Sequence, residues 1–132
     1  MSGPEEVQDW VSKAEADYEA ALDLMRRRKA PLPEVVCFHC QQCAEKYLKA
    51  FLISRGVPFP KVHDLIALKK LCVAEEGAFE LIHDLLGSLE GYDVAIRYPG
   101  EVATVEDARE AIAAMKEVRQ FVRTMLGNQP QT

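Results

Sequence analysis

Apolar side chains recur at helical spacing along almost the whole chain, and this pattern restricts the fold more than any other feature. Between about residues 5 and 28 they fall every three or four positions, which places them on one face of a helix. Four later segments show the same spacing, and no segment shows the alternation typical of a strand. The expected helices cover roughly residues 5–28, 33–55, 64–74, 78–98 and 104–127.

Prolines, glycines and capping residues predict where these helices begin and end. Pro33 suits the first turn of the second helix, and Gly56 suits the position just after its end. Residues 57–62 read as an extended, proline-stiffened connector. Pro99 closes the fourth helix, and Thr104 is placed to cap the fifth. The expected fold is all-α: one domain over residues 1–132, an antiparallel up-and-down bundle of four long helices and one short helix.

Composition excludes several classes of function. The net charge is −5, whereas a general nucleic-acid binder needs concentrated Lys and Arg. No apolar run follows a basic start, so no signal peptide is expected. No window approaches the roughly 20 apolar residues that a membrane span needs. The expected compartment is the cytoplasm, and no membrane association is predicted.

Three of the four cysteines repeat every third residue in the second helix. Cys37, Cys40 and Cys43 form this series, and Cys72 lies apart. Zinc sites draw four ligands from two knuckles or loops, and the chain has no second CxxC. Cysteine in a cytosolic helix usually packs as a small hydrophobe. We therefore expect reduced, buried thiols, no bound metal and no cofactor.

The second helix carries a stripe of polar side chains beside its apolar face. At 100° per residue, Lys46 lies about 20° and Gln42 about 60° from His39, so the three share one narrow arc. A helix that only fills a core does not need this second stripe. Phe38, Leu52 and Ile53 lie near the arc, which makes the helix apolar nearly all round. Such a helix is central in the bundle or also packs against a second subunit, and we expect a homodimer.

Further polar residues lie at helix ends. His63 precedes the third helix, and Tyr92, Arg97 and Tyr98 lie at the end of the fourth. Taken singly, each has a structural explanation, such as an i,i+4 ion pair between Asp93 and Arg97. Taken together, Arg, Lys, His and Tyr suit an anionic ligand. The chain contains none of the motifs GxxxxGK[ST], GxGxxG after a strand, HExxH or GxSxG.

These blocks, in this order and spacing, resemble the HEPN domain (higher eukaryotes and prokaryotes nucleotide-binding). The blocks are residues 37–52, 56–60, 63–65, 92 and 97–99, and the resemblance covers about residues 10–126. It implies four long antiparallel helices with a shorter fifth, usually in a dimer, and an association with nucleotides or RNA. It also implies a minimal nucleotidyltransferase as partner, in some cases within a toxin–antitoxin pair.

One departure from the family pattern bears on catalysis. Ribonuclease members carry an Arg followed four to six residues later by a His. Here Arg97 is followed by Tyr98, Pro99 and Gly100 without a His, and seven residues separate Arg55 from His63. The ribonuclease motif is therefore missing, and a non-catalytic role in nucleotide or partner binding is expected.

The expected ligand site combines residues from three parts of the chain. Lys46 and Arg97 are expected to face phosphate, His63 to donate a hydrogen bond, and Tyr98 to stack or position the ligand. Outer candidates are Tyr92, His39 and Lys49. Two alternatives stay open. One is a metal-independent ribonuclease with His63 or His39 as acid–base, and the other is a purely structural dimerisation module.

Overall fold

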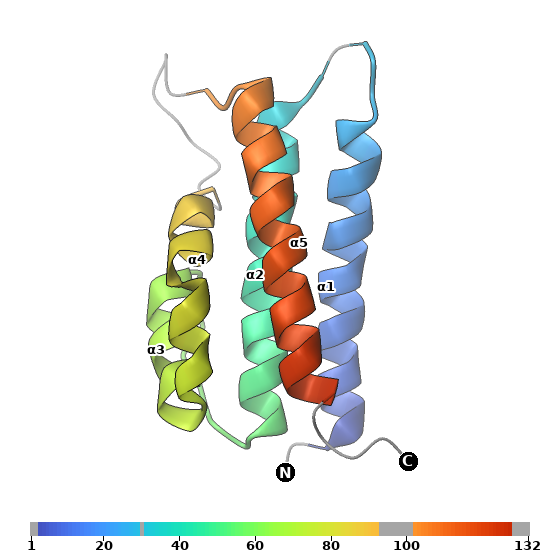
Figure 1. Cartoon of the computed structure of the whole chain (residues 1–132). Coiled ribbons are helices and arrows are strands. Elements are labelled where there is room, and N and C mark those ends of the chain that lie inside the picture. The colour runs from blue at the N-terminus through green and yellow to red at the C-terminus, as the bar shows by residue number, and fades with distance from the viewer. Residues whose placement is uncertain (1–2, 30, 93–101, 128–132) are drawn as a thin grey trace.

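The computed structural model describes residues 3–29, 31–92 and 102–127 of the chain, and the elements found there are helices (Figure 1). They are α1 Pro4–Met25, α2 Pro33–Ser54, α3 Leu65–Glu75, the 3₁₀ helix η1 Gly77–Ile82, α4 His83–Leu89 and α5 Val105–Gly127. The all-α class expected from periodicity is confirmed. None of the helices in the described ranges is long and apolar enough to cross a membrane.

Helix α2 lies at the centre of the bundle, with α1 on one side, α3 and α4 on the other, and α5 packed along it in front (Figure 1). Helix α1 runs antiparallel to α2, whereas α5 runs parallel to it. Two contacts fix the parallel direction: Ala103 N donates to Glu34 Oε1 (3.3 Å) at one end, and Arg123 Nη1 donates to Tyr47 Oη (3.2 Å) towards the other.

Helix α3 also runs parallel to α2, and in this detail the structure differs from the expected up-and-down order. Near the start of α3, Gln41 Nε2 donates to the carbonyl oxygen of His63 (3.1 Å), and further along, Cys72 Sγ lies 3.9 Å from the carbonyl of Leu48. The cause is the connector over residues 56–64. Nine extended residues span up to about 30 Å, enough to return from the end of α2 to the level of Gln41 before α3 begins.

The predicted helix ends are mostly confirmed. Pro33 opens α2, and Gly56 follows its end with φ +68°, the left-handed conformation that favours glycine. The Asp64 side chain caps α3 by accepting from Ala67 N (3.0 Å). Thr104 and Asp107 bond each other's backbone N–H groups at the start of α5 (2.8 and 3.0 Å). Helix α1 ends at Met25, three residues before the expected position, so the basic run follows the helix.

The expected fourth helix over residues 78–98 is wrong in extent. In its place the chain forms the 3₁₀ helix η1 and then α4, which ends at Leu89. Glu90 leaves the helix with extended backbone (ψ 135°), and its carboxylate accepts from the N–H groups of Leu65 (3.3 Å) and Ile66 (3.1 Å). Gly91 then adopts φ +91°. The free N–H groups at the start of α3 thus gain an acceptor that a continuous helix could not supply.

The core is built largely from α2, and it contains all four cysteines, as expected. It also contains Leu52, which corrects part of the predicted dimer face. Leu52 is fully buried within one chain and Ile53 is partly buried, whereas Phe38 is 37% exposed. Helices α1, α3, α4 and α5 all pack against α2 within one chain, and this central position accounts for its apolar residues on nearly every side.

Candidate functional site

The polar stripe of α2 meets a carboxylate of α1. Nδ1 of His39 lies 2.8 Å from Oδ1 of Asp17, and Lys46 Nζ donates to Oδ2 of the same residue (2.5 Å). Asp17 is only 8% exposed. His39 and Lys46 therefore lie together, as helix geometry predicts, but their charge is directed at a buried acid rather than at open solvent.

A second buried carboxylate, Glu45, gathers the other candidate cations. Lys49 Nζ donates to its Oε2 (2.8 Å), and Nδ1 of His63 lies 3.0 Å from its Oε1. Gln41 Nε2 reaches Oε1 at 3.5 Å. Glu45 is 2% exposed and Lys49 6% exposed. Burying these charges without partners would be costly, so each one stabilises the other in the folded chain.

Two aromatic rings complete the surroundings of Lys49. Its Nζ lies 5.5 Å from the ring centroid of Trp10 and 5.6 Å from that of Phe59, within the range of cation–π contacts. The two rings meet edge to face at 6.1 Å. Phe59 belongs to the connector and Trp10 to α1, so this contact holds the connector against the bundle.

We call the whole row the α1–α2 seam. It comprises Asp17, His39, Glu45, Lys46, Lys49 and His63. Within it the two lysines are neutralised by carboxylates, so a phosphate would have to compete with Asp17 or Glu45 for them. His63 differs from the others because its side chain is 62% exposed.

An open depression lies beside His63, lined by Val62, Asp64, Ile66 and Glu90. Partial desolvation raises the pKa of Glu90, and the N–H groups of Ile66 and Leu65 oppose this shift by bonding to its charged form. An anion here would face carboxylates on two sides. Any anion in the depression would therefore need a cation from outside its described lining.

The remaining predicted site residues are only partly within the described structure. Tyr92 is half-buried and packs against the core. Arg97 and Tyr98 lie outside the described residues, and so does the suggested Asp93–Arg97 ion pair. Their roles stay predictions.

A network that the sequence did not predict joins α1, α2 and α5. Arg119 donates twice to Glu15, through Nε and Nη2 (both 2.7 Å), and Tyr47 Oη donates to the same carboxylate. The bonds from Arg119 lower the pKa of Glu15, and burial raises the pKa of Tyr47 to about 12. Arg123 donates to Tyr47 Oη from α5. Within this network the donors of Arg119 and Tyr47 bind the carboxylate of Glu15, which joins the three helices.

A smaller cluster links α3 to the turn that follows it. Lys69 is 5% exposed, and its Nζ donates to Glu80 Oε1 (2.7 Å) and to Nδ1 of His83 (2.9 Å). His83 is thus an acceptor for a buried lysine. In the described part of the chain, His, Cys, Asp and Glu form no group of three that could hold a metal ion.

Comparison with known proteins agrees with the helical arrangement. The family model described as HEPN domain matches residues 7–125. The crystal structure of ST0689, an archaeal HEPN homologue, is similar with a TM-score of 0.71 and 25% identity, covering 90% of this chain and 96% of that one. TT1696 from Thermus thermophilus has the same fold (TM-score 0.74, 22% identity, 94% of this chain and 98% of that one). The comparison with curated protein sequences found no match.

Proposed function

We propose that this chain, which belongs to the HEPN domain family, is a non-catalytic accessory subunit that acts through protein contacts. It pairs with a second copy of itself and holds a nucleotidyltransferase subunit. The observation that carries this proposal is a group of exposed apolar side chains at one end of the bundle. The basic residues His39, Lys46 and Lys49 of α2, by contrast, are bonded to acids of their own chain.

The apolar group lies where α2 and α5 begin, and we call it the end surface. Its members are Leu32 (37% exposed), Val35 (38%), Phe38 (37%), Val102 (64%) and Val105 (38%). The bond from Ala103 N to Glu34 holds the two helix starts together. The five side chains gather at one end of the bundle, and grouped exposed apolar side chains mark protein interfaces.

Pairing of two copies through the end surface follows from general rules of assembly. Homo-oligomers are mostly two-fold dimers in which the same patch contacts itself, and an uncharged patch is self-complementary. The five members are apolar, and the carboxylate of the neighbouring Glu34 accepts a bond from Ala103 N within its own chain. Phe38 supplies the large aromatic contact that interface centres favour.

The nucleotidyltransferase partner rests on family membership and on the resemblance noted above. Small stand-alone domains of this type often pair with a minimal nucleotidyltransferase, in some cases as a toxin–antitoxin module. A dimer formed through one end of each bundle leaves the long sides of α1, α3 and α4 available to a partner. The missing Arg–His spacing of the ribonuclease branch supports an accessory role over a catalytic one.

Amide hydrogen exchange at two protein concentrations tests the position of the contact. Pairing predicts that peptides covering residues 31–38 and 102–108 exchange more slowly at high concentration, where the dimer forms. Peptides covering η1, which carries the exposed Leu81, serve as the internal control and should not change. Concentration-independent exchange over both segments would contradict the proposal.

Nucleotide or RNA phosphate binding is a second candidate function, and the exposure of His63 favours it. A side chain that is 62% exposed beside an open depression can meet a ligand, whereas Lys49 cannot without giving up Glu45. If the chain binds phosphate, Arg97 supplies the positive charge and His63 donates a hydrogen bond. Calorimetric titration with ATP and a short RNA tests it, and absence of measurable binding would exclude it.

A further inference from the structure

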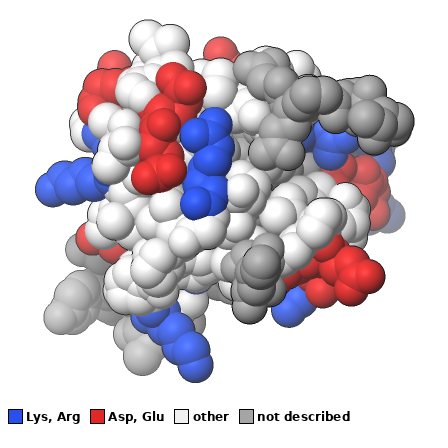
Figure 2. Space-filling view, turned by 90° about the horizontal axis from the view of Figure 1, so that it is seen from below, with Lys and Arg blue, Asp and Glu red and all other residues white. Residues whose placement is uncertain are grey.

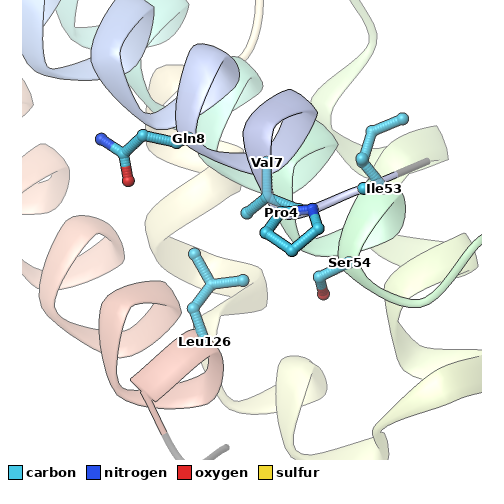
Figure 3. A pocket seen from close by; sticks show the side chains of 7 residues that line it. Pro4, Val7, Gln8, Ile53, Ser54 and Leu126 are labelled. Carbon is cyan, nitrogen blue, oxygen red and sulfur yellow. The ribbon is translucent and has the colours of Figure 1, made fainter. Parts of the chain in front are cut away.

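A groove lies at the opposite end of the bundle, between the start of α1 and the ends of α2 and α5 (Figure 3). One part has a volume of about 250 Å³ and is lined by Pro4, Val7, Gln8, Ile53, Ser54 and Leu126, among others. An adjoining part of about 380 Å³ shares Val7, Gln8 and Leu126, and adds Val11 and Arg123. We call the two parts together the α1–α5 groove. Figure 2 shows this end of the bundle, where uncharged side chains occupy a broad area between acidic and basic ones.

The charge beside this groove is not balanced. Glu15 already accepts two bonds from Arg119, and Arg123 Nη1 lies 3.9 Å from the same carboxylate. Two guanidinium groups therefore share one carboxylate, which leaves an excess of one positive charge in the network. The Arg123 side chain is 47% exposed and lines the groove, so this excess faces the open space rather than the core.

We infer that the α1–α5 groove binds a small carboxylate with a short apolar body. The carboxylate pairs with Arg123, and the apolar body lies against Val7, Val11 and Leu126. Gln8 supplies a further amide at the wall, whereas the Ser54 hydroxyl already donates to the carbonyl oxygen of Phe51. This site is separate from the end surface and from the α1–α2 seam, and it does not depend on the proposed function.

Charge and shape favour a carboxylate over other anions. A monocarboxylate matches the single excess charge and the planar fork of a guanidinium. A phosphate monoester carries more negative charge and would place it close to Glu15. Nucleotides also need a surface on which the base can stack, and the groove lining contains no aromatic side chain among the described residues.

A nuclear magnetic resonance titration with hexanoate tests the site. Shifts are expected at the amides of Val7, Gln8 and Leu126, with a dissociation constant on the order of 1 mM, ordinary for a ligand of this size. Hexanol and hexylammonium are the matched probes without negative charge, and both should bind about tenfold more weakly or not at all. Hexanol binding as tightly as hexanoate would overturn the inference, and so would an absence of shifts at these amides.

Two variants separate the charge effect from damage to the fold. Arg123→Gln should weaken hexanoate binding about tenfold or more. Gln8→Glu keeps the size of an exposed side chain, adds a negative charge to the groove and should also weaken binding. Arg109→Gln, at an exposed arginine near the start of α5, is the control and should bind as the wild type does. Unchanged affinity in either groove variant would contradict the assignment.

The source of the carboxylate is decided with a second pair of probes. Acetyl-Ala-Val ends in a carboxylate on an apolar residue, like the C-terminus of a partner peptide, and its C-terminal amide is the uncharged match. Tighter binding of the acid than of hexanoate indicates a peptide C-terminus as the natural ligand. Weaker binding indicates a free organic acid. Equal binding of the peptide acid and its amide would contradict a carboxylate site.

Discussion

Arg119 and Glu15 form a two-bond ion pair, 2.7 Å at each contact, between residues 104 positions apart in the chain. The pair ties α5 to α1, which otherwise meet mainly through α2. Arg119 also stacks over the ring of Tyr18, with its guanidinium carbon 4.2 Å from the centroid. Both contacts depend on the planar guanidinium group. A lysine ammonium has no planar fork to match both carboxylate oxygens and no flat face to stack on the ring.

Arg119→Lys is expected to destabilise the fold by about 1–2 kcal/mol, because the second bond and the stacking are lost while the charge is kept. Urea unfolding followed by circular dichroism measures this. The matched control is Arg109→Lys, whose pair with Glu106 is exposed on both sides and should change stability by about 0.5 kcal/mol or less. Equal effects of the two changes would show that the partly buried, two-bond geometry adds nothing to stability.

The same pair predicts a dependence on pH. The bonds from Arg119 lower the pKa of Glu15 in the folded chain from its ordinary value of 4.5. Its contribution to stability is therefore complete above pH 4.5 and is lost as the pH falls through the lowered value. Wild type should exceed Glu15→Gln in unfolding free energy at about pH 7, and the difference should shrink by about pH 3. A difference that grows on acidification would contradict this account.

Much of the fold could be predicted from sequence, because helical spacing and caps act locally. Pro33, Gly56 and Thr104 each mark a helix end by their own chemistry. The directions of the helices relative to one another were harder to predict. The sequence of the connector gives its stiffness, but it does not show that the connector returns along α2. The early end of α4 depends on Glu90 reaching the start of α3, a contact 24 and 25 positions away.

The sequence predicted the residues that α2 contributes to the site, but not those that α1 contributes. The stripe of His39 and Lys46 was visible because both belong to one helix. Their partner Asp17 was missed, since periodicity gives the face of a helix but not what lies opposite. A signal was present: Asp17 lies in the stripe formed by Trp10, Ala14 and Ala21, where an acid needs a partner. The expectation for Arg97 and Tyr98 lies outside the described residues.

The cysteines are expected to be unreactive in the folded chain. Burial raises the pKa of Cys72 to about 12 and raises the pKa values of Cys40 and Cys43 as well, so little thiolate exists at about pH 8. Ellman's reagent should therefore react slowly with native protein and should report four thiols in urea. Rapid release of one or more thiols from the native protein would contradict the buried placement.

Removing the side chain of Lys46 and removing that of Arg97 should have different effects on stability and on ligand affinity. Lys46→Ala leaves Asp17 with His39 as its remaining bonded partner and should lower stability by about 1–3 kcal/mol, with little effect on ligand affinity. If the phosphate-binding candidate is correct, Arg97→Ala should weaken binding of ATP or RNA by about 1.5–3 kcal/mol with little effect on stability. Paired unfolding and calorimetric titrations measure both. Loss of affinity in Lys46→Ala at unchanged stability would place the ligand in the α1–α2 seam instead.

Sedimentation equilibrium at micromolar concentration is the most direct test of pairing through the end surface. The wild type is expected at twice the chain mass of 14.8 kDa. Phe38→Glu, which places a charge in the end surface, should weaken association about tenfold or more and shift the mass towards a single chain. Leu81→Glu is the control, because Leu81 is 79% exposed on η1 rather than in the end surface, and it should stay dimeric. A wild type that remains at 14.8 kDa, or a Phe38→Glu variant that associates as strongly as wild type, would contradict the proposal.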